Sequence, residues 1–209
     1  MPRTKEQIEQ LREQRNTQLL KAAQRVFSRQ GFHAANISDV AAEAGVSQGT
    51  VYHYFDSKEE LLLAVYTHWE TQHLRDEIGK ALQLEPTAAR KLAFIARSAT
   101  ERVSSSLQLL QASVEFWSHI PRNADIRKGF KRMFARMADD VAKVIQQGVD
   151  AGEFRKVDAT VTARLLIATY DGLVLQWLAD KRGVDWQACT DTLVTVVLKG
   201  LSPEGKPKR

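Results

Sequence analysis

The sequence predicts an all-α fold in which a small N-terminal domain of three helices precedes a larger helical domain. Two observations support this prediction. Apolar residues recur every three to four positions in almost every segment, as expected for helices that bury one face. No turn signal of the Asn-Gly kind separates alternating apolar runs, so hairpins are not expected. Glycines and prolines fall between the periodic segments and mark where each helix ends.

Length and composition agree with a globular protein. The 209 residues are 44 % hydrophobic, which is enough for a sizeable core, and the formal net charge is +5. The single cysteine, Cys189, excludes an intramolecular disulfide framework. No stretch approaches the roughly 18 apolar residues of a membrane span, and the charged start has no signal-peptide core. We therefore expect a cytoplasmic protein that contacts no membrane.

The first helix is expected over residues 6–30, with a frayed start before Asn16. Its apolar positions line one face, and Gly31 provides the stop. A second, short helix follows Asn36, which has Asp39 at capping-box spacing, and it ends at Gly45. The apolar face of the first helix is formed by Ile8, Leu11, Leu19, Ala22, Ala23, Val26 and Phe27.

Ser47 caps the predicted third helix. Val51 and Phe55 are four residues apart, so they share a face. If that face points inward, the polar side of the helix points outward. The residues expected on the outward side are Gln48, Gly49, Tyr52 and His53.

Ser57 and Glu60 have the spacing of a capping box and open a long helix that runs towards Leu82. Further helices are expected after Pro86, followed by a loose charged tail. Their approximate ranges are 87–104, 107–119, 124–151, 159–181 and 186–199. The resulting domains are 1–57 for the helix-turn-helix part, 58–201 for the larger helical part and 202–209 for the tail.

Two short helices joined by "AGVSQ" have the form of a helix-turn-helix, whose second helix enters the DNA major groove. The string from about residue 17 to residue 66 closely resembles the N-terminal domain of the tetracycline-repressor (TetR) family of bacterial transcriptional regulators. The resemblance rests on the Gly31-Phe32 turn, "ISDVAAEAGVS", "YHYF" and "SKEEL". The remainder, with "AGEFR" and "YDGLVLQW", resembles the helical ligand-binding and dimerisation region of that family more loosely.

The resemblance implies a homodimer that binds a palindromic DNA operator, usually as a repressor, and is released by a small-molecule effector. The implied base-contacting residues are Gln48, Gly49 and Thr50. The implied phosphate-contacting residues are Ser38, Ser47, Tyr52, His53 and Lys58. A glutamine can contact adenine with two hydrogen bonds, a glycine allows close approach, and a threonine methyl can meet a thymine methyl.

This sequence departs mildly from the common form of the family, with Asn36 in place of threonine and Gln48 in place of lysine. Plainer roles remain open for single residues: Tyr52 can pack at the rim of the small domain, and Lys58 can serve only to solvate a helix start. Arg3 and Lys5 can reach a minor groove, although a disordered start is the simpler interpretation.

The segment 161–178 is apolar on nearly every side, so one of its faces is expected to meet a partner subunit. The last helix would complete a four-helix interface. The residues expected at this dimer interface are Leu166, Tyr170, Leu173, Val174, Trp177, Leu193, Val196 and Val197.

Aromatic and methionine side chains in the middle helices are candidates for the walls of an apolar cavity, although spacing of this kind more often means ordinary core packing for any single residue. An apolar or amphipathic effector is therefore expected. The candidates are Trp69, Phe94, Phe116, Trp117, Phe130, Met133, Phe134, Met137, Tyr170 and Trp177. Polar residues that could orient a ligand are Glu115, His119, Asp171 and Gln176.

An enzyme is not expected. His68 and His73 are five residues apart, which is a poor spacing for a metal on one helix face. Cys189 has no histidine nearby, and no glycine-rich phosphate loop is present. We therefore expect no catalytic residues, metal or cofactor. The alternative function is a helical ligand-binding or interaction protein that does not bind DNA.

Overall fold

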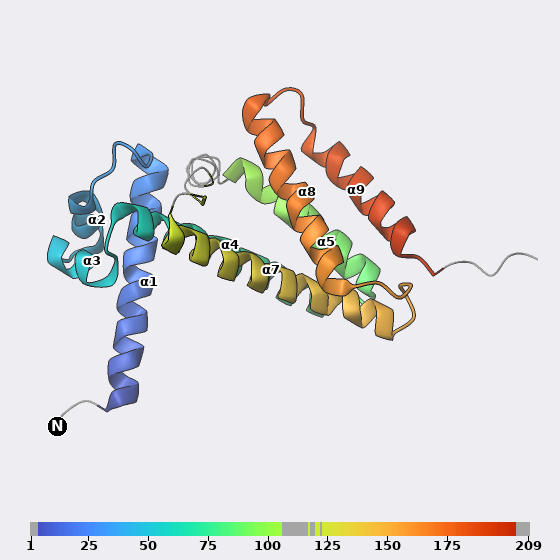
Figure 1. The fold of residues 1–209 in the computed structure, drawn as a ribbon, viewed down its shortest axis with the longest axis horizontal. Helices are drawn as coiled ribbons and strands as arrows, with labels where there is room; N and C mark the ends of the chain where they lie inside the picture. The colour runs from blue at the N-terminus through green and yellow to red at the C-terminus, as the bar shows by residue number, and fades with distance from the viewer. Residues whose placement is uncertain (1–3, 106–116, 118–119, 122, 204–209) are drawn as a thin grey trace, which may run out of the picture. The chain divides into compact units, whose positions relative to one another are not determined.

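The computed structural model describes residues 4–105, 117, 120–121 and 123–203, and over these ranges it contains helices and no strand. The chain divides into two compact units (Figure 1). Unit 1 consists of Met1–Trp69 and Ser106–Phe130, and unit 2 consists of Glu70–Ser105 and Lys131–Arg209. The all-α prediction is confirmed. The predicted domain boundary after Ser57 stays a prediction.

Unit 1 begins with α1 (Lys5–Gln30), α2 (Ile37–Ala44) and α3 (Gln48–Tyr54). The structure shows no frayed start before Asn16, because α1 is helical from Lys5. The Thr4 hydroxyl accepts from the Gln7 amide at 3.2 Å, and the Gln7 side chain accepts from the Thr4 amide at 3.0 Å. This reciprocal cap stabilises a first turn whose side chains are exposed.

The second helix starts and stops as the sequence predicts. The Asn36 amide donates to the Asp39 carboxylate at 2.9 Å, which is one half of the expected capping box. At the other end, Gly45 has φ of 66° and ψ of 37°, a left-handed conformation that favours glycine. The chain therefore turns sharply into Val46 and Ser47, where α3 begins.

Hydrogen bonds and ion pairs tie α1 to α2. The Gln18 side-chain amide donates to the Ala44 carbonyl at 2.7 Å. Arg25 and Arg29 lie 2.7 Å and 3.3 Å from the two carboxylate oxygens of Glu43. Below these polar contacts the apolar faces are buried. The most buried large side chains of α1, α2, α3 and the start of the next helix are Leu19, Val26, Phe27, Val40, Val51, Leu61 and Leu62.

Two long helices, α4 (Lys58–Leu84) and α7 (Ala124–Asp150), each contribute residues to both units. Within unit 1 they approach closely at Gly129, where an added Cβ would lie 2.6 Å from a methyl carbon of Leu63. The rings of Tyr66 and Phe130 pack nearby, with centroids 6.1 Å apart. The helix predicted over 107–119 falls outside the described residues except for Trp117.

The remaining helices of unit 2 are α5 (Ala88–Ser105), α8 (Ala159–Ala179) and α9 (Trp186–Leu201), and each ends within two residues of its predicted bounds. Capping explains where they start. The Asp158 and Asp185 carboxylates accept from amides in the first turns of α8 and α9. Glu153 accepts from the first two amides of α5 at 3.1 Å and 3.3 Å.

The core of unit 2 is formed by apolar side chains from all five of its helical segments. The α9 end is held by Arg155, whose side chain donates to the Gly200 carbonyl at 2.6 Å. Phe154 fills the space beside Gly148, where a Cβ would collide with the ring. The buried core residues include Leu74, Leu92, Ile95, Val141, Ile145 and Phe154.

Candidate DNA-binding surface and ligand cavity

The α3 helix buries one side and exposes the other. Val51 is fully buried and Phe55 is 6 % exposed, so both anchor the helix to unit 1. Gln48, Gly49 and His53 are exposed, and Tyr52 is 52 % exposed. The predicted orientation of the helix is therefore confirmed. Its outward side presents the amide of Gln48, the backbone at Gly49, the phenol of Tyr52 and the imidazole of His53.

Ser47 holds the N-terminus of this helix in place. Its hydroxyl accepts from the Thr50 amide at 3.1 Å, as a serine N-cap does. The same oxygen lies 2.9 Å from the Thr50 hydroxyl. The Thr50 side chain is thus fixed by a local hydrogen bond, while Gln48 and Gly49 stand in the first turn with exposed surfaces.

Gly49 is not required by the packing of the protein itself. A Cβ added at this position would meet only the Ser47 hydroxyl, at an ordinary contact distance of 3.7 Å. No positive φ is recorded there. Neither the available space nor the backbone conformation therefore demands glycine at this position.

The two residues expected to contact phosphates at the starts of α2 and α4 differ in their surroundings. Ser38 is exposed. The Lys58 ammonium instead donates to the carbonyl oxygens of Phe32 at 2.9 Å and Ala35 at 3.0 Å, and lies 4.4 Å from the centre of the Phe32 ring. A phosphate contact by Lys58 would have to compete with these internal contacts.

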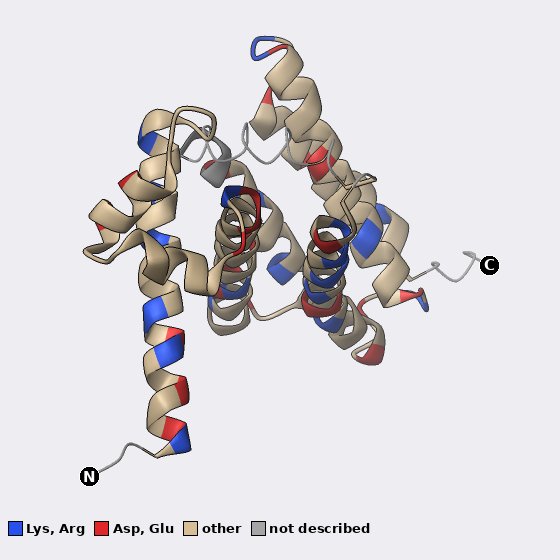
Figure 2. Ribbon diagram, turned by 60° about the vertical axis from the view of Figure 1, so that its left-hand side comes forward, with Lys and Arg blue, Asp and Glu red and all other residues tan. Residues whose placement is uncertain are grey.

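The charged residues of unit 1 lie outside α3, whose sequence QGTVYHY contains no lysine, arginine or carboxylate. Basic and acidic side chains are both present along the exposed N-terminal part of α1 (Figure 2). Neutral hydrogen-bonding groups thus dominate the outward side of α3. Groups of this kind recognise base edges and phosphate oxygens by geometry more than by net charge.

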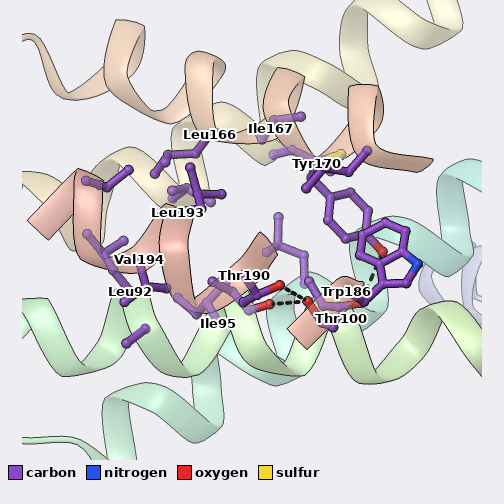
Figure 3. A pocket seen from close by; sticks show the side chains of 18 of the residues that line it. Leu92, Ile95, Thr100, Leu166, Ile167, Tyr170, Trp186, Thr190, Leu193 and Val194 are labelled. Carbon is purple, nitrogen blue, oxygen red and sulfur yellow. Dashed lines mark hydrogen bonds between the residues drawn. The ribbon is translucent and has the colours of Figure 1, made fainter. Parts of the chain in front are cut away.

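Unit 2 contains an apolar cavity of about 120 Å³ that is walled mainly by α5, α8 and α9 (Figure 3). Residues of α4 and α7 complete the wall. One end of the cavity, as drawn in Figure 3, is formed by aliphatic side chains, namely Leu92, Leu166, Leu193 and Val194. The other end is formed by Thr100, Tyr170, Trp186 and Thr190.

The polar groups at that second end are partly engaged by each other. The Thr100 and Thr190 hydroxyls are 2.5 Å apart, and the Thr100 hydroxyl also donates to the Ala96 carbonyl at 3.2 Å. The Tyr170 hydroxyl donates to the Ala99 carbonyl at 3.1 Å. The rings of Tyr170 and Trp186 lie with their centroids 5.8 Å apart.

A carboxyl pair belongs to the same region of unit 2. Glu70 lines the cavity and is only 4 % exposed. Asp171 follows Tyr170 on α8, and burial, with a further contribution from the charge of Glu70, raises the pKa of the Asp171 carboxyl to about 7. A carboxyl group removed from water favours its neutral form, and a neighbouring negative charge has the same effect.

Among the aromatic and methionine candidates that the structure describes, Met137 and Tyr170 line this cavity. Trp69, Phe130 and Met133 are buried elsewhere in the core, where Trp69 and Phe130 pack against Tyr66. Phe94 lines a separate polar crevice on α4 and α5. Trp117, Phe134 and Trp177 do not line this cavity. Phe116 lies outside the described residues.

Residues expected at a dimer interface are divided between the cavity and the surface. Leu166, Tyr170, Leu173, Leu193 and Val197 line the cavity, and Val174 is buried within the chain. Val196 is 62 % exposed, whereas Trp177 is half-buried and packs against Trp186. Large apolar side chains that the expectation omitted are exposed on the same helix, α8: Val161, Leu165 and Leu175.

The sequence interpretation missed the contribution of α5 and the first turn of α9 to the cavity. Ile95, Thr100, Trp186 and Thr190 carry no motif, and their spacing is that of ordinary core residues. Of the proposed ligand-orienting residues, Asp171 directly follows the cavity-lining Tyr170 on α8, Gln176 is exposed, and Glu115 and His119 lie outside the described residues. Glu70 could have been noticed as a carboxylate on the apolar side of a long helix.

Among the described residues, no group of histidine, cysteine and carboxylate side chains could hold a metal ion. A search of the same residues finds no helix long and apolar enough to cross a membrane.

An exposed helix-turn-helix in one unit and an apolar cavity in the other define the class of a ligand-responsive DNA-binding regulator. Residues 19–65 match the bacterial regulatory proteins of the tetR family, and residues 88–199 match the C-terminal domain of BetI-type transcriptional repressors. The chain belongs to the tetR family. Members of this family bind DNA operators and small-molecule effectors.

Similar proteins include a fatty acid metabolism regulator of Bacillus subtilis, 23 % identical over 88 % of this chain and 94 % of that protein. Two solved structures share the fold. Thermus thermophilus FadR in complex with lauroyl-CoA is 22 % identical, with a TM-score of 0.73 over 93 % of this chain and 98 % of its own. A Saccharomonospora viridis protein in complex with choline is 24 % identical, with a TM-score of 0.70 over 92 % and 100 %.

Proposed function

We propose that the chain represses transcription as a homodimer that binds a palindromic operator through α3 and releases it when an effector fills the cavity of unit 2. The observation that carries the DNA-binding part is the exposed side of α3 opposite the buried Val51. On this side Gln48 and Gly49 would contact bases, and Ser47, Tyr52 and His53 would contact phosphates. The chemistry of each group fits its role, because amides can pair with adenine, and hydroxyl and imidazole groups donate to phosphate oxygens.

The dimer would form through the exposed apolar side of α8 and α9. Leu165 is 64 % exposed and Val196 is 62 % exposed, and a shallow apolar groove lies between the two helices at Leu173, Cys189 and Leu193. Apolar residues of this size on one helical face are typical of a subunit interface. A two-fold dimer would place two copies of α3 on one duplex, and a palindromic operator is the matching DNA symmetry.

The size of the cavity supports coupling between effector and DNA. Ligand sites usually enclose about 300–1,000 Å³, whereas this cavity has about 120 Å³. An effector would therefore have to move the surrounding helices. Helix α4 contributes Leu74 to the cavity wall. At its start, Lys58 of the same helix donates a hydrogen bond to the Phe32 carbonyl in the segment that follows α1. A shift of α4 would then disturb the spacing of about 34–36 Å that two recognition helices need.

The proposal also places the protein in the cytoplasm, where DNA is accessible, and assigns it no catalytic activity, in line with relatives that are named as transcriptional regulators.

The test is DNA capture followed by footprinting. Genomic DNA bound by the full-length protein is sequenced, and the enriched segment is used for protection and titration at several salt concentrations. A protected palindrome, with affinity that falls steeply as salt rises, supports the proposal. Binding that shows no sequence preference would favour the alternative, a helical ligand-binding protein that does not act on DNA.

A further inference from the structure

The wall of the unit 2 cavity is mainly aliphatic and aromatic. Among the described residues that line it there is no lysine, arginine or histidine. A carboxylate or phosphate group that entered the cavity would lose its hydration without meeting a cation on this wall, which is strongly unfavourable. The described wall therefore favours a ligand that carries no negative charge.

Two threonine hydroxyls form a polar spot in this wall. Thr100 of α5 and Thr190 of α9 both line the cavity, and their hydroxyl oxygens are 2.5 Å apart. Figure 3 shows the two side chains meeting between the helices. Thr190 is only 4 % exposed, so water has little access to its hydroxyl group.

The hydrogen atoms of this pair are both used inside the protein. A hydroxyl group has one hydrogen to donate and two lone pairs to accept with. The Thr100 hydroxyl donates its hydrogen to the Ala96 carbonyl at 3.2 Å. The hydrogen between the two threonines then comes from Thr190, because only this arrangement makes both hydrogen bonds at once. The lone pairs of the Thr190 oxygen remain, so the pair can accept a hydrogen bond from a ligand but cannot donate one.

The neighbouring polar groups do not add a donor beside the pair. The Tyr170 hydroxyl donates to the Ala99 carbonyl at 3.1 Å. The indole nitrogen of Trp186 lies on the side of its ring away from the two threonines in Figure 3. A ligand oxygen that only accepts, such as that of an ether, would therefore gain nothing at this spot, whereas an O–H group would find an acceptor.

We propose that the effector is an uncharged, apolar molecule with a hydroxyl group, that is, an alcohol or a phenol. Its O–H donates to the oxygen of Thr190, and its apolar body lies among Leu92, Leu166 and Leu193. This inference rests on the proposed function, since it specifies the ligand of the same cavity. A fatty carboxylate is excluded by two independent features of the described wall, the lack of a cation and the lack of a donor at the threonine pair.

The experiment compares three probes: octanol, its isomer heptyl methyl ether, which has the oxygen but no O–H group, and octanoate. Each is titrated into the full-length protein at neutral pH, and binding is followed by calorimetry and by tryptophan fluorescence. We expect octanol to bind about fivefold more tightly than the ether, the value of one hydrogen bond, and at least about tenfold more tightly than octanoate. Ether or octanoate binding as tightly as octanol, or no binding of octanol, would overturn the inference.

The double variant Thr100→Val, Thr190→Val locates the effect. Valine has the shape of threonine, and replacing both partners of a hydrogen bond by apolar groups of the same shape costs little stability. We expect the preference for octanol over the ether to fall below about twofold. Thr162→Val is the matched control on α8, since its hydroxyl donates to the Asp158 carbonyl in the same way but does not line the cavity.

The control variant should keep the preference for octanol. An unchanged preference in the folded double variant contradicts the inference. If the double variant does not fold, the order of the three probes in the unmodified protein decides the question.

The same probes are added to the protein bound to its captured DNA. Release by octanol and not by octanoate supports both proposals. Release by octanoate or by an acyl coenzyme A, with no effect of octanol, overturns the inference and leaves the proposed function intact. Failure of the unliganded protein to bind any DNA segment specifically contradicts the proposed function, while the order of the three affinities still decides the inference.

Discussion

The Lys58 ammonium lies 2.9 Å from the carbonyl oxygen of Phe32 and 4.4 Å from the centre of the Phe32 ring. Lys58 is the first residue of α4, and Phe32 follows α1. The Lys58 side chain therefore donates hydrogen bonds to carbonyl groups in the segment between α1 and α2, which is not helical. It also makes a cation–π contact with Phe32. These contacts hold the start of α4 against the segment between α1 and α2.

Replacing Lys58 by methionine should destabilise unit 1. The apolar stem is kept, whereas the hydrogen bonds to the Phe32 and Ala35 carbonyls are lost. Hydrogen bonds to a charged group contribute about 1.5–3 kcal/mol, so we expect the free energy of unfolding to fall by about 2 kcal/mol in denaturant titrations. Lys21→Met, at an exposed position of α1, is the control. Equal stability of the two variants would show that the Lys58 contacts contribute nothing.

Gly49→Ala should separate DNA binding from folding. Alanine is favoured over glycine in a helix by about 1 kcal/mol, and the new methyl group would meet only the Ser47 hydroxyl. The thermal midpoint is therefore expected to stay level or rise. Operator affinity is expected to fall at least about tenfold, because the methyl group keeps the helix from the base edges. Parallel calorimetry and gel-shift titration check both expectations, and unchanged affinity would remove Gly49 from the DNA interface.

Gln48→Ala tests sequence recognition. A pair of hydrogen bonds from an amide to adenine gives about 1–3 kcal/mol of discrimination. We expect the variant to lose that preference at one position in each operator half while its binding to non-specific DNA stays the same. The measurement is a titration against operators substituted at single positions. A variant that weakens all sequences equally would assign Gln48 to phosphate contact.

Leu165→Glu tests the dimer interface. The residue is 64 % exposed in the single chain, so a glutamate should leave the monomer fold intact, yet a charge buried between two subunits would be strongly unfavourable. We expect a monomer in sedimentation at micromolar concentration and loss of operator binding. Leu84→Glu, equally exposed at 66 % on α4, should remain a dimer. A dimer formed by both variants would place the interface elsewhere.

Asp171→Asn should change how stability depends on pH. The pKa of Asp171 is raised to about 7 in the folded protein, so ionisation favours the unfolded chain between about pH 4 and pH 7. Stability contributed by the neutral carboxyl is present at low pH and is lost as pH rises through 7. Asparagine has no such loss.

We therefore expect the thermal midpoint of Asp171→Asn to match that of the unmodified protein near pH 4 and to exceed it most above pH 7. Thermal unfolding followed by circular dichroism over this range measures the difference. A difference that does not vary with pH would contradict a raised pKa at this carboxyl group.

Most of the helices could be predicted because local signals define them. Ser47, Asp158 and Asp185 are caps recognisable from residue type and spacing, and Gly45 can adopt a left-handed conformation at low cost. The four-residue spacing of Val51 and Phe55 places both on one face of α3. The outward side of α3, and with it the candidate DNA contacts, follows from that local geometry alone.

The cavity could not be predicted in the same way. Helix α8 is apolar on nearly all sides, so its periodicity does not indicate which side faces the core and which faces a partner. Leu166 and Leu173 were expected at the dimer interface and line the cavity, while Leu165 is exposed one residue away. The choice depends on how α5 and α9 pack against α8.

The order of amino acids by itself specifies where the helices begin and end, and which groups α3 turns outward, since these depend on contacts between residues three or four positions apart. Packing between distant segments decides that Thr100, Tyr170 and Trp186 meet at one end of a cavity. Those residues lie on three different helices, α5, α8 and α9, and only the folded core of unit 2 brings them together.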